Sequence, residues 1–365
     1  MEWKIADNRM LFQFEGRILE KNDVFYLGYT NSYIRFFTKG TDVEAYITSN
    51  ITEEVNMAGL SVFVDDEKEP SNKVVLDKAT GWYKLVCLPD DGEHLITVVK
   101  VTEAAMSHAG FVTVKIEDGE LLKRSFPVRP ELKLEFIGDS ITCGYGVLGE
   151  PLSEYTLREE DGLLGYAQIA ADIVGARARF VSASGYGVCV EYTGNREGNI
   201  PKLYPYTNWF VDSEVKYDFS EYIPDVVIIN LGTNDSGHMH KEDIQELFVN
   251  SYAAFLKRIR TAYPCAAILC ICGTLCDTMF GWIDQAVDIC REDKIEGIYV
   301  RRLPYHNVEK DGMASQHPSL VTHRKDGERV AAYIREILTG DGGTFLLSRG
   351  VSLVGDKNAM SRWWY

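Results

Sequence analysis

The sequence contains no apolar run that approaches the ~20 residues needed for a membrane-spanning helix. Basic residues are also in the minority, because 38 Lys and Arg stand against 54 Asp and Glu and give a net charge of -16. A surface this negative repels phosphate backbones and anionic lipids, so neither nucleic acid nor a membrane is an expected partner. The N-terminus has no basic segment followed by an apolar stretch, and we therefore expect a cytoplasmic protein.

The cysteine pattern is that of neither a disulfide framework nor a structural zinc site. Eight cysteines in 365 residues are an ordinary number for a reducing compartment. Four of them are clustered, namely Cys265, Cys270, Cys272 and Cys276. Their spacing contains no C-x2-C pair, and two of them lie in an apolar run that is typical of a buried strand. We predict no metal site there, and none at His238 and His240, which lack a third ligand at suitable spacing.

Two parts of the chain differ in periodicity. In the first part, short alternating runs such as 43–47 and 111–116 are separated by turn residues, which is typical of an all-β sandwich or jelly roll. Pro127 and Pro130 then bracket a linker, after which strands alternate with long helices. The predicted organisation is a β-sandwich domain over 1–127, an α/β domain over 131–340 and a C-terminal tail over 341–365.

In the α/β part, near-continuous apolar strands are separated by amphipathic helices. The predicted strands are 132–137, 179–183, 225–231, 266–272 and 297–300. The predicted helices are 164–174, 241–262, 282–291 and 323–338. This alternation predicts a doubly wound parallel sheet covered on both faces, with its functional site outside the carboxyl ends of the strands.

Polar residues suited to acyl transfer follow several of these strands. Ser140 comes directly after the first strand, where a strand-to-helix turn would present a nucleophile, although serine is also a common helix cap. Asn234 follows a central strand and could stabilise an oxyanion, as could a backbone amide of Gly185 or Gly187. His317 precedes the last helix and could act as a general base.

Taken together, GDSITCGYG at 138–146, SGYG at 184–187, GTND at 232–235 and HPS at 317–319 resemble the SGNH (GDSL-like) hydrolase superfamily. The first part also resembles the β-sandwich that precedes this domain in carbohydrate esterase family 2, in Gly16-Arg17 and in 33–43. The resemblance implies a flavodoxin-like catalytic domain. It also implies removal of acetyl groups from plant polysaccharides such as xylan and mannan, often at the 6-hydroxyl.

The resemblance also implies a role for individual residues. Ser140 corresponds to the nucleophile and His317 to the general base. The oxyanion donors would be the backbone N–H of Ser140, the backbone N–H of Gly187 and the side-chain amide of Asn234, with Gly185 as the competing glycine. No metal or organic cofactor is implied.

One position departs from the family pattern. Many members carry an aspartate three residues before the histidine, but Ala314 stands there. Related esterases include members in which a backbone carbonyl orients the imidazole, so the resemblance implies a Ser–His dyad of this kind as our first expectation. A triad completed by Asp311 or Asp277 is the alternative.

Four further residues are candidates for substrate binding. They are Asp139, Tyr186, Trp209 and Gln316. Trp209 lies in the aromatic segment 204–210, and aromatic faces stack on sugar rings. Gln316 stands where some family members have a tryptophan. The glycines of 144–149 match a dinucleotide-binding pattern by chance, because six residues separate them from the preceding strand.

We expect a carbohydrate O-acetyl esterase that acts on acetylated oligosaccharides through an acetyl-enzyme. One alternative is a lipid esterase or thioesterase of the same superfamily. A second alternative is a carbohydrate-binding protein without catalytic activity. The aromatic end of the tail, 363–365, could dock onto the β-domain or onto a second subunit, so a homo-oligomer also stays open.

Overall fold

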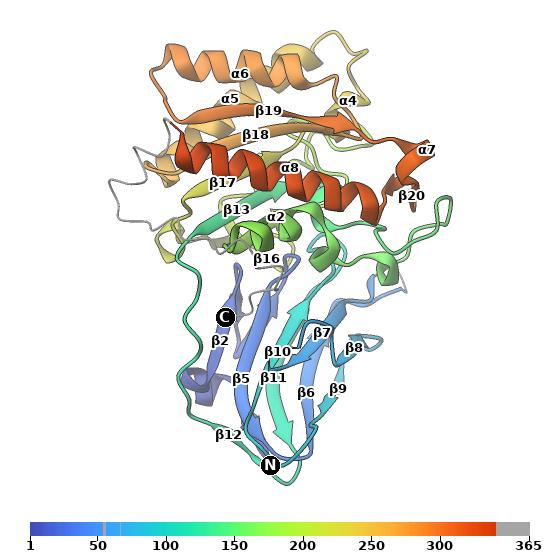
Figure 1. Ribbon diagram of the computed structural model, residues 1–365, viewed down its shortest axis with the longest axis vertical. Helices are drawn as coiled ribbons and strands as arrows, with labels where there is room; N and C mark the ends of the chain where they lie inside the picture. Colours follow the sequence, from blue (N-terminus) through green and yellow to red (C-terminus); the bar gives the residue numbers. More distant parts are fainter. Residues whose placement is uncertain (54–55, 66, 341–365) are drawn as a thin grey trace.

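The computed structural model describes residues 1–53, 56–65 and 67–340, and it places a β-sandwich beside an α/β domain (Figure 1). The sandwich, hereafter the β-domain, consists of two antiparallel sheets. One has the order β3-β4-β11-β6-β9, with β1 added to β11; the other has the order β12-β5-β10-β7-β8, with β2 added to β5. The predicted sandwich is confirmed.

The strands of the β-domain have the following bounds. They are β1 (Glu2–Lys4), β2 (Phe12–Glu15), β3 (Leu19–Lys21), β4 (Val24–Leu27), β5 (Tyr33–Lys39), β6 (Asp42–Ser49), β7 (Gly59–Val64), β8 (Asn72–Val75), β9 (Thr80–Cys87), β10 (His94–Lys100), β11 (Ala109–Ile116) and β12 (Glu120–Leu122). Alternate residues of β6 are buried, so that Val43, Ala45 and Ile47 face the core between the sheets. A 3-10 helix, η1 (Ala6–Leu11), joins β1 to β2.

The α/β domain is built on a five-stranded parallel sheet of order β14-β13-β17-β18-β19. In chain order this is 2-1-3-4-5, the order of flavodoxin-like folds, which confirms the predicted doubly wound architecture. The strands are β13 (Lys133–Gly138), β14 (Arg177–Ser182), β17 (Val226–Asn230), β18 (Ala267–Thr274) and β19 (Ile298–Tyr305). All eight residues of β18 are buried, as expected for a strand covered on both faces.

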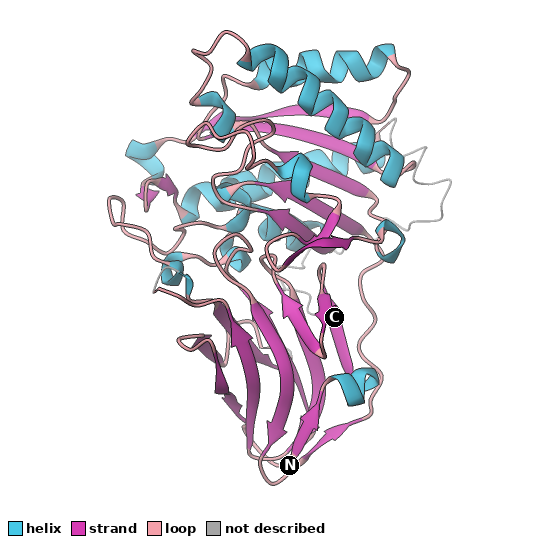
Figure 2. Ribbon diagram, turned by 180° about the vertical axis from the view of Figure 1, so that it is seen from behind, coloured by secondary structure: helices cyan, strands magenta, loops and turns pink. Residues whose placement is uncertain are grey.

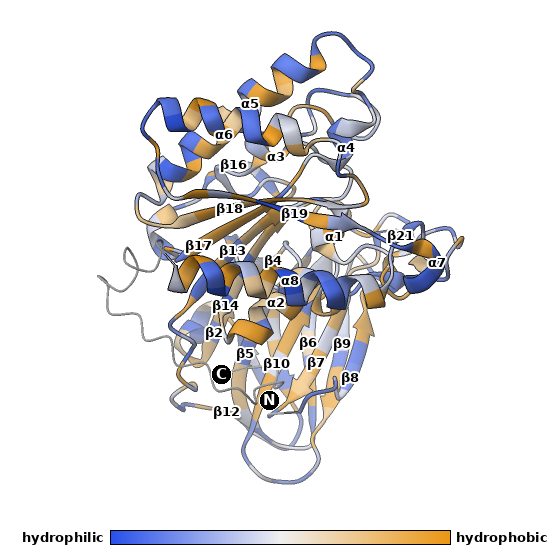
Figure 3. Cartoon of the chain, turned by 45° about the horizontal axis from the view of Figure 1, so that its top comes forward, coloured by the Kyte–Doolittle hydropathy of each residue, from blue (hydrophilic) through white to orange (hydrophobic). Residues whose placement is uncertain are grey.

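Helices cover both faces of this sheet (Figure 2). One face packs against α2 (Tyr166–Val174) and α8 (Leu320–Thr339), and the other against α5 (Ile244–Ala262) and α6 (Phe280–Glu292). The hydropathy of the chain follows this layering, because the strands of the parallel sheet are apolar whereas α5, α6 and α8 combine apolar and polar residues (Figure 3).

Short elements connect these layers. They are α1 (Ser140–Cys143), η3 (Leu157–Glu159), η4 (Gly162–Leu164), α3 (Ile200–Leu203), β15 (Tyr206–Asn208), β16 (Asp212–Lys216), η5 (Phe219–Glu221), α4 (Thr233–Ser236), α7 (Val308–Asp311), β20 (Met313–Ala314) and β21 (His317–Pro318). Part of the aromatic segment 204–210 forms β15, which pairs with β16 in a hairpin.

The β-domain lies below the α/β domain in the view of Figure 1 and contacts the β14 edge of the parallel sheet. Glu15 of β2 forms ion pairs with Arg177 and Arg179 of β14, and Asn31 donates a hydrogen bond to the carbonyl of Gly162 at 2.9 Å. Among the described residues, no helix is both long and apolar enough to span a membrane. The tail predicted over 341–365 lies outside the described residues.

Candidate active site

Ser140 lies at the carboxyl end of β13 as the first residue of α1. Asp139 caps this helix, because its Oδ1 accepts the N–H of Ile141 at 3.0 Å. The turn is tight: a Cβ on Gly138 would lie 2.0 Å from Oγ1 of Thr142, so only glycine fits there. Ser140 is only 6% exposed. The strand-to-helix turn therefore holds the hydroxyl in one place at the edge of the sheet.

His317 faces this hydroxyl from the other side. Its Nε2 lies 3.0 Å from Oγ of Ser140, and its Nδ1 lies 3.2 Å from the carbonyl oxygen of Ser315. An Nδ1–H donated to this carbonyl leaves Nε2 as the acceptor for the serine proton. Burial lowers the pKa of His317, and the nearby carbonyl opposes this shift only in part. The imidazole is therefore neutral near pH 7, as a general base must be.

A strained turn delivers His317 to this position. Strands β20 and β21 pair through Ala314 and His317, and the two residues between them, Ser315 and Gln316, have φ of 45° and 61°. Two-residue hairpin turns of this kind favour Asn and Gly, so two other side chains here store strain of about 1–3 kcal/mol each. The carbonyl that orients the imidazole belongs to this turn.

The loop before η3 holds the turn in place. The N–H of Ser315 donates to the carbonyl of Glu150 at 2.8 Å, and the N–H of Gln316 donates to the carbonyl of Pro151 at 3.1 Å. The Ser315 hydroxyl donates to Oε2 of Glu159 at 3.0 Å. These hydrogen bonds, with a further one between the hydroxyls of Ser153 and Ser315 at 3.1 Å, fix a turn that its own sequence does not favour.

Neither acid that the sequence left open as an orienting group takes that role. Asp311 instead pairs with Lys325 at 2.5 Å, because it lies in α7, on the side of the turn that faces α8. Among the described residues, neither Asp311 nor Asp277 hydrogen-bonds to His317. The geometry is that of the Ser–His pair oriented by a carbonyl.

Asn234 is brought close to the Ser140 turn. It lies in α4, directly after β17, and its Nδ2 donates to the carbonyl of Tyr186 at 3.0 Å and approaches Oδ2 of Asp139 at 3.5 Å. Burial, reinforced by the charges of Asp235 and Glu103, raises the pKa of Asp139 to about 7. The amide therefore sits between the nucleophile turn and the loop that follows β14.

That loop carries both candidate glycines, and Asp235 fixes its far end. The Asp235 carboxylate accepts the backbone N–H groups of Val188, Cys189 and Val190 at 2.9–3.1 Å. A Cβ on Gly187 would lie 2.5 Å from Oδ2 of Asp235, so this close approach requires glycine. The oxyanion role of Gly187, with Gly185 as the alternative, stays a prediction.

The candidate substrate-binding residues occupy different surroundings. Gln316 is exposed beside His317, whereas Asp139 is buried below Ser140. Tyr186 is half-buried and meets Phe210 edge to face at 5.7 Å. Trp209 lies next to β15 and packs on Tyr206 at 4.8 Å.

Tyr145, which is not among the predicted site residues, lines the general base, and Tyr155 packs behind it. Tyr145 packs against the His317 ring with centroids 4.3 Å apart, and Tyr155 stacks on Tyr145 at 3.6 Å. The GDSITCGYG motif contains Tyr145, but its spacing gives no sign that the ring turns toward a histidine 172 residues later.

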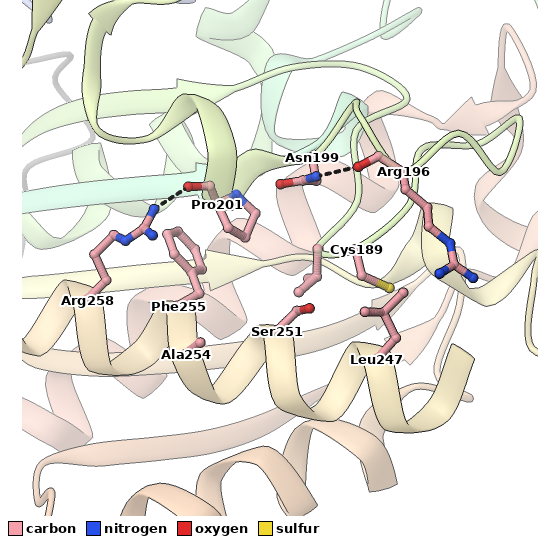
Figure 4. A pocket seen from close by; sticks show the side chains of 10 residues that line it. Cys189, Arg196, Asn199, Pro201, Leu247, Ser251, Ala254, Phe255 and Arg258 are labelled. Carbon is pink, nitrogen blue, oxygen red and sulfur yellow. Dashed lines mark hydrogen bonds between the residues drawn. The ribbon is translucent and has the colours of Figure 1, made fainter. Parts of the chain in front are cut away.

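A separate pocket of about 300 Å³ lies between the segment 188–201 and α5 (Figure 4). Its wall includes Cys189, Ser251 and Phe255, with Arg196 and Arg258 at its edges. Arg258 donates to the carbonyl of Pro201 at 2.6 Å. Neither Ser140 nor His317 lines this pocket. We therefore locate the candidate active site at the Ser–His pair and not at the pocket.

Two family models match the chain. The GDSL-like Lipase/Acylhydrolase family matches residues 136–298, and the Carbohydrate esterase 2 N-terminal model matches residues 14–124. Among curated proteins, the "Cellulase/esterase CelE" of Acetivibrio thermocellus is 33% identical over 269 residues, which cover 72% of this chain. An "Acetylxylan esterase / glucomannan deacetylase" of Cellvibrio japonicus is 23% identical over 62% of this chain. The chain spans only 32% and 63% of the length of these relatives.

Solved structures extend the similarity across both domains. A family two carbohydrate esterase from Clostridium thermocellum, in complex with cellohexaose, is 30% identical, with a TM-score of 0.80 over 90% of this chain and 99% of that one. The acetyl xylan esterase Est2A from Butyrivibrio proteoclasticus is 20% identical, with a TM-score of 0.81 over 93% of this chain and 98% of that one. At 20% identity, the similarity to Est2A is evidence for the fold alone.

Proposed function

Since the chain belongs to carbohydrate esterase family 2, we propose that it is a serine esterase that removes O-acetyl groups from cell-wall oligosaccharides such as acetylated mannan and xylan. The observation that carries the proposal is the 3.0 Å contact between Nε2 of His317 and Oγ of Ser140, with Nδ1 held by the carbonyl of Ser315. A Ser–His pair of this geometry, next to amide donors, is suited to acyl transfer.

The first half of the proposed reaction acylates the enzyme. His317 takes the Ser140 proton on Nε2 as Oγ attacks the acetyl carbonyl carbon. The oxyanion of the tetrahedral intermediate is stabilised by Asn234 and by backbone N–H groups of Ser140 and the 184–187 loop. When the intermediate collapses, the bond between the carbonyl carbon and the sugar oxygen breaks. The sugar leaves as an alcohol with the proton from His317.

The second half regenerates the serine. Water enters where the sugar left and gives a proton to His317 as its oxygen attacks the acetyl-enzyme. Collapse of this second intermediate breaks the bond to Oγ of Ser140, which regains its proton, and acetate is released. The carbonyl of Ser315 keeps Nε2 directed at the reacting atoms in both halves.

The substrate class rests on the family and on the nature of the relatives. A similar esterase has been solved with cellohexaose, a β-linked hexose chain, which supports a sugar polymer as the leaving group. The net charge of -16 is compatible with a neutral sugar ester, since such a substrate needs no electrostatic attraction.

Ser140→Ala tests the catalytic proposal. We expect kcat/KM for 4-nitrophenyl acetate to fall by about 10⁴-fold or more, because the nucleophile is lost while the fold remains. Ser71→Ala, a serine change in the β-domain, should leave the rate unchanged. A Ser140→Ala protein with full activity would exclude the mechanism.

The acyl group and the sugar position need separate measurements. An acetate ester turned over much faster than an octanoate ester supports the carbohydrate esterase, whereas the reverse order supports a lipid esterase or thioesterase. NMR of acetylated manno- and xylo-oligosaccharides after treatment identifies the hydroxyl that loses its acetyl group. Binding of these oligosaccharides without turnover would favour a non-catalytic carbohydrate-binding protein.

A further inference from the structure

The loop that carries Gly185 and Gly187 is held at both ends by buried carboxylates. Asp235, from the α/β domain, binds the amides that follow Gly187. At the other end the N–H of Ser184 donates to Oε2 of Glu103 at 2.7 Å. Glu103 belongs to the β-domain, in the segment after β10. The two glycines thus lie between two points at which the loop is bound, one by a carboxylate of the β-domain and one by a carboxylate of the α/β domain.

Glu103 is an unusual residue to find at this boundary. Its side chain is completely buried, and its second oxygen, Oε1, has no hydrogen-bond partner among the described residues. The nearby Lys100 ammonium does not supply one, because it donates to the backbone carbonyls of Gly28, Thr102 and Glu103 itself. Burying a carboxylate costs stability unless it is paired. The position of Glu103 therefore calls for a role that its local packing does not provide.

Glu160 of the α/β domain is also buried, and its carboxyl group lies close to that of Glu103. One oxygen from each carboxyl group and the Cys143 sulfur lie within 4.8 Å of one another. The Oε1 of Glu160 is also buried and without a partner in the described part of the chain. Two facing carboxyl groups in an apolar site hold at least one proton between them. Burial correspondingly raises the pKa of Glu103, and raises that of Glu160 well above its usual range.

Glu160 connects this pair to the other side of the active site. Its Oε2 accepts the Tyr155 hydroxyl at 2.6 Å, and Tyr155 stacks on Tyr145, whose ring packs on His317. The buried pair of carboxyl groups therefore has two contacts at the active site. Through Glu103 it binds the start of the loop that carries the two glycines, and through Glu160 it binds Tyr155, behind the general base.

We propose that Glu103, a residue of the β-domain, is a positioning residue of the active site: its carboxyl group fixes the Ser184 amide and, through it, the loop that carries the oxyanion glycine. The proposal rests on the proposed function, because it takes this loop to stabilise the oxyanion. It makes the β-domain part of the catalytic apparatus, since the α/β domain alone would leave the start of the loop without its acceptor.

The test compares Glu103→Ala with Glu103→Gln in the full chain, with rates on 4-nitrophenyl acetate normalised to the fraction of enzyme that titrates with a fluorophosphonate. Without an acceptor for Ser184, we expect kcat to fall by about 10- to 100-fold with KM nearly unchanged, because a small displacement of catalytic donors acts on the transition state. Glutamine should restore most of the activity, since its oxygen can accept the Ser184 N–H and its amide can donate to Glu160. Equal kcat in the alanine variant and the parent would overturn the proposal.

Two further variants separate positioning from domain docking and from misfolding. Glu15→Gln weakens the boundary at the other end of β14 and should lower stability with kcat per active site unchanged. If Glu103→Ala does not fold, Glu103→Asp keeps the carboxyl group but withdraws it by one methylene from Ser184, and it should show the same fall in kcat. A kcat that falls as much in Glu15→Gln as in the Glu103 variants would also overturn positioning.

Failure of the proposed function can be recognised independently. It would appear as a wild-type protein that releases no acid from any acyl ester. The role of Glu103 would then be judged from the rate at which Ser140 displaces fluoride from the fluorophosphonate, because that reaction also builds charge on an oxygen facing the loop. A Glu103→Ala protein that reacts as fast as wild type would exclude the positioning role.

Discussion

Two groups of buried acids at the domain boundary differ in how their charge is balanced. Beside the first residues of β14, Glu15 is surrounded by Arg129, Arg177 and Arg179. At the carboxyl end of the sheet, Glu103 and Glu160 face each other without a cation bonded to either carboxylate among the described residues. One group is an ion-pair network, and the other is a pair of like groups.

The acids of the two groups also differ in the direction of their pKa shifts. Burial alone would raise the pKa of Glu15, but the charges of Arg179, Arg177 and Arg129 outweigh it and hold the pKa below its usual value. Burial raises the pKa of Glu103, and hydrogen bonds from Ser184 do not overcome it. Acids whose environment opposes ionisation are concentrated at functional sites, whereas matched pairs are typical of structural contacts. The comparison therefore predicts that changes at the first group alter stability and changes at the second alter catalysis.

The largest effect is expected for Arg17→Met, at the amino half of the sheet. Arg17 and Glu135 form a completely buried ion pair at 3.0 Å across the domain boundary. Removing the guanidinium leaves the carboxylate, among the described residues, with the hydroxyls of Tyr204 and Tyr263 as its hydrogen-bond donors. This loss should lower the free energy of unfolding by about 3–5 kcal/mol. Urea denaturation measures this loss, and kcat per active site should not change. An Arg17→Met protein that loses kcat but keeps its stability would contradict the distinction between a structural and a catalytic region of the boundary.

The division of the chain into a sandwich and a doubly wound sheet was predictable because hydrophobic periodicity is a local property. The period changes near Pro127, and the five apolar runs became β13, β14, β17, β18 and β19, with boundaries that differ by a few residues. The hairpin β15–β16 was not foreseen, since its aromatic residues gave no alternating pattern.

The Ser–His pair could be predicted because each residue lies in a recognisable motif. A backbone carbonyl was the first expectation for the orienting group, but the sequence could not specify that of Ser315, because a backbone carbonyl leaves no mark in the sequence. Glu103 was missed for a different reason. Its partner Ser184 belongs to the other domain, and no spacing rule connects residues that meet only in the folded chain.

The next largest effect is expected for Asn234→Ala, at the carboxyl end of the sheet. Loss of this proposed oxyanion donor should lower kcat by about 10²–10³-fold, or about 3–4 kcal/mol in the activation free energy. The melting temperature should change by only a few degrees, because Asn234 is half-buried and its bonds to Tyr186 and Asp139 are replaceable by water. Asn72→Ala in the β-domain serves as the matched control. A large loss of stability with unchanged kcat would contradict the comparison.

A smaller effect is expected from Ser315→Ala in the turn that carries the imidazole. The change removes the hydroxyl contact with Glu159 and should reduce stability by about 1 kcal/mol. We expect kcat to fall by about tenfold as well, because the turn that orients His317 is then less firmly held. Asn307→Ala removes the N-cap of α7 at a similar cost in stability. If both variants lose kcat equally, the effect is one of general stability.

The smallest expected effect is a change in the pH dependence of stability, and it should have opposite sign for the two groups. The folded pKa of Glu15 lies below the unfolded value of about 4.3, so its stabilising contribution is present above that value and is lost as pH falls through the folded pKa. Glu15→Gln should therefore be less stable than the parent at neutral pH, by a margin that shrinks in acid.

Glu103 should behave in the reverse manner, because its folded pKa lies above the unfolded value. Its contribution is complete below about pH 4.3 and is lost as pH rises through the folded pKa. Glu103→Gln should match the parent in acid and exceed its melting temperature at neutral pH, since glutamine has no charge to bury. Melting curves between pH 4 and 8 measure both differences. Shifts of the same sign in the two variants would mean that the two groups of acids are electrostatically alike, and the contrast between a structural and a catalytic boundary would fail.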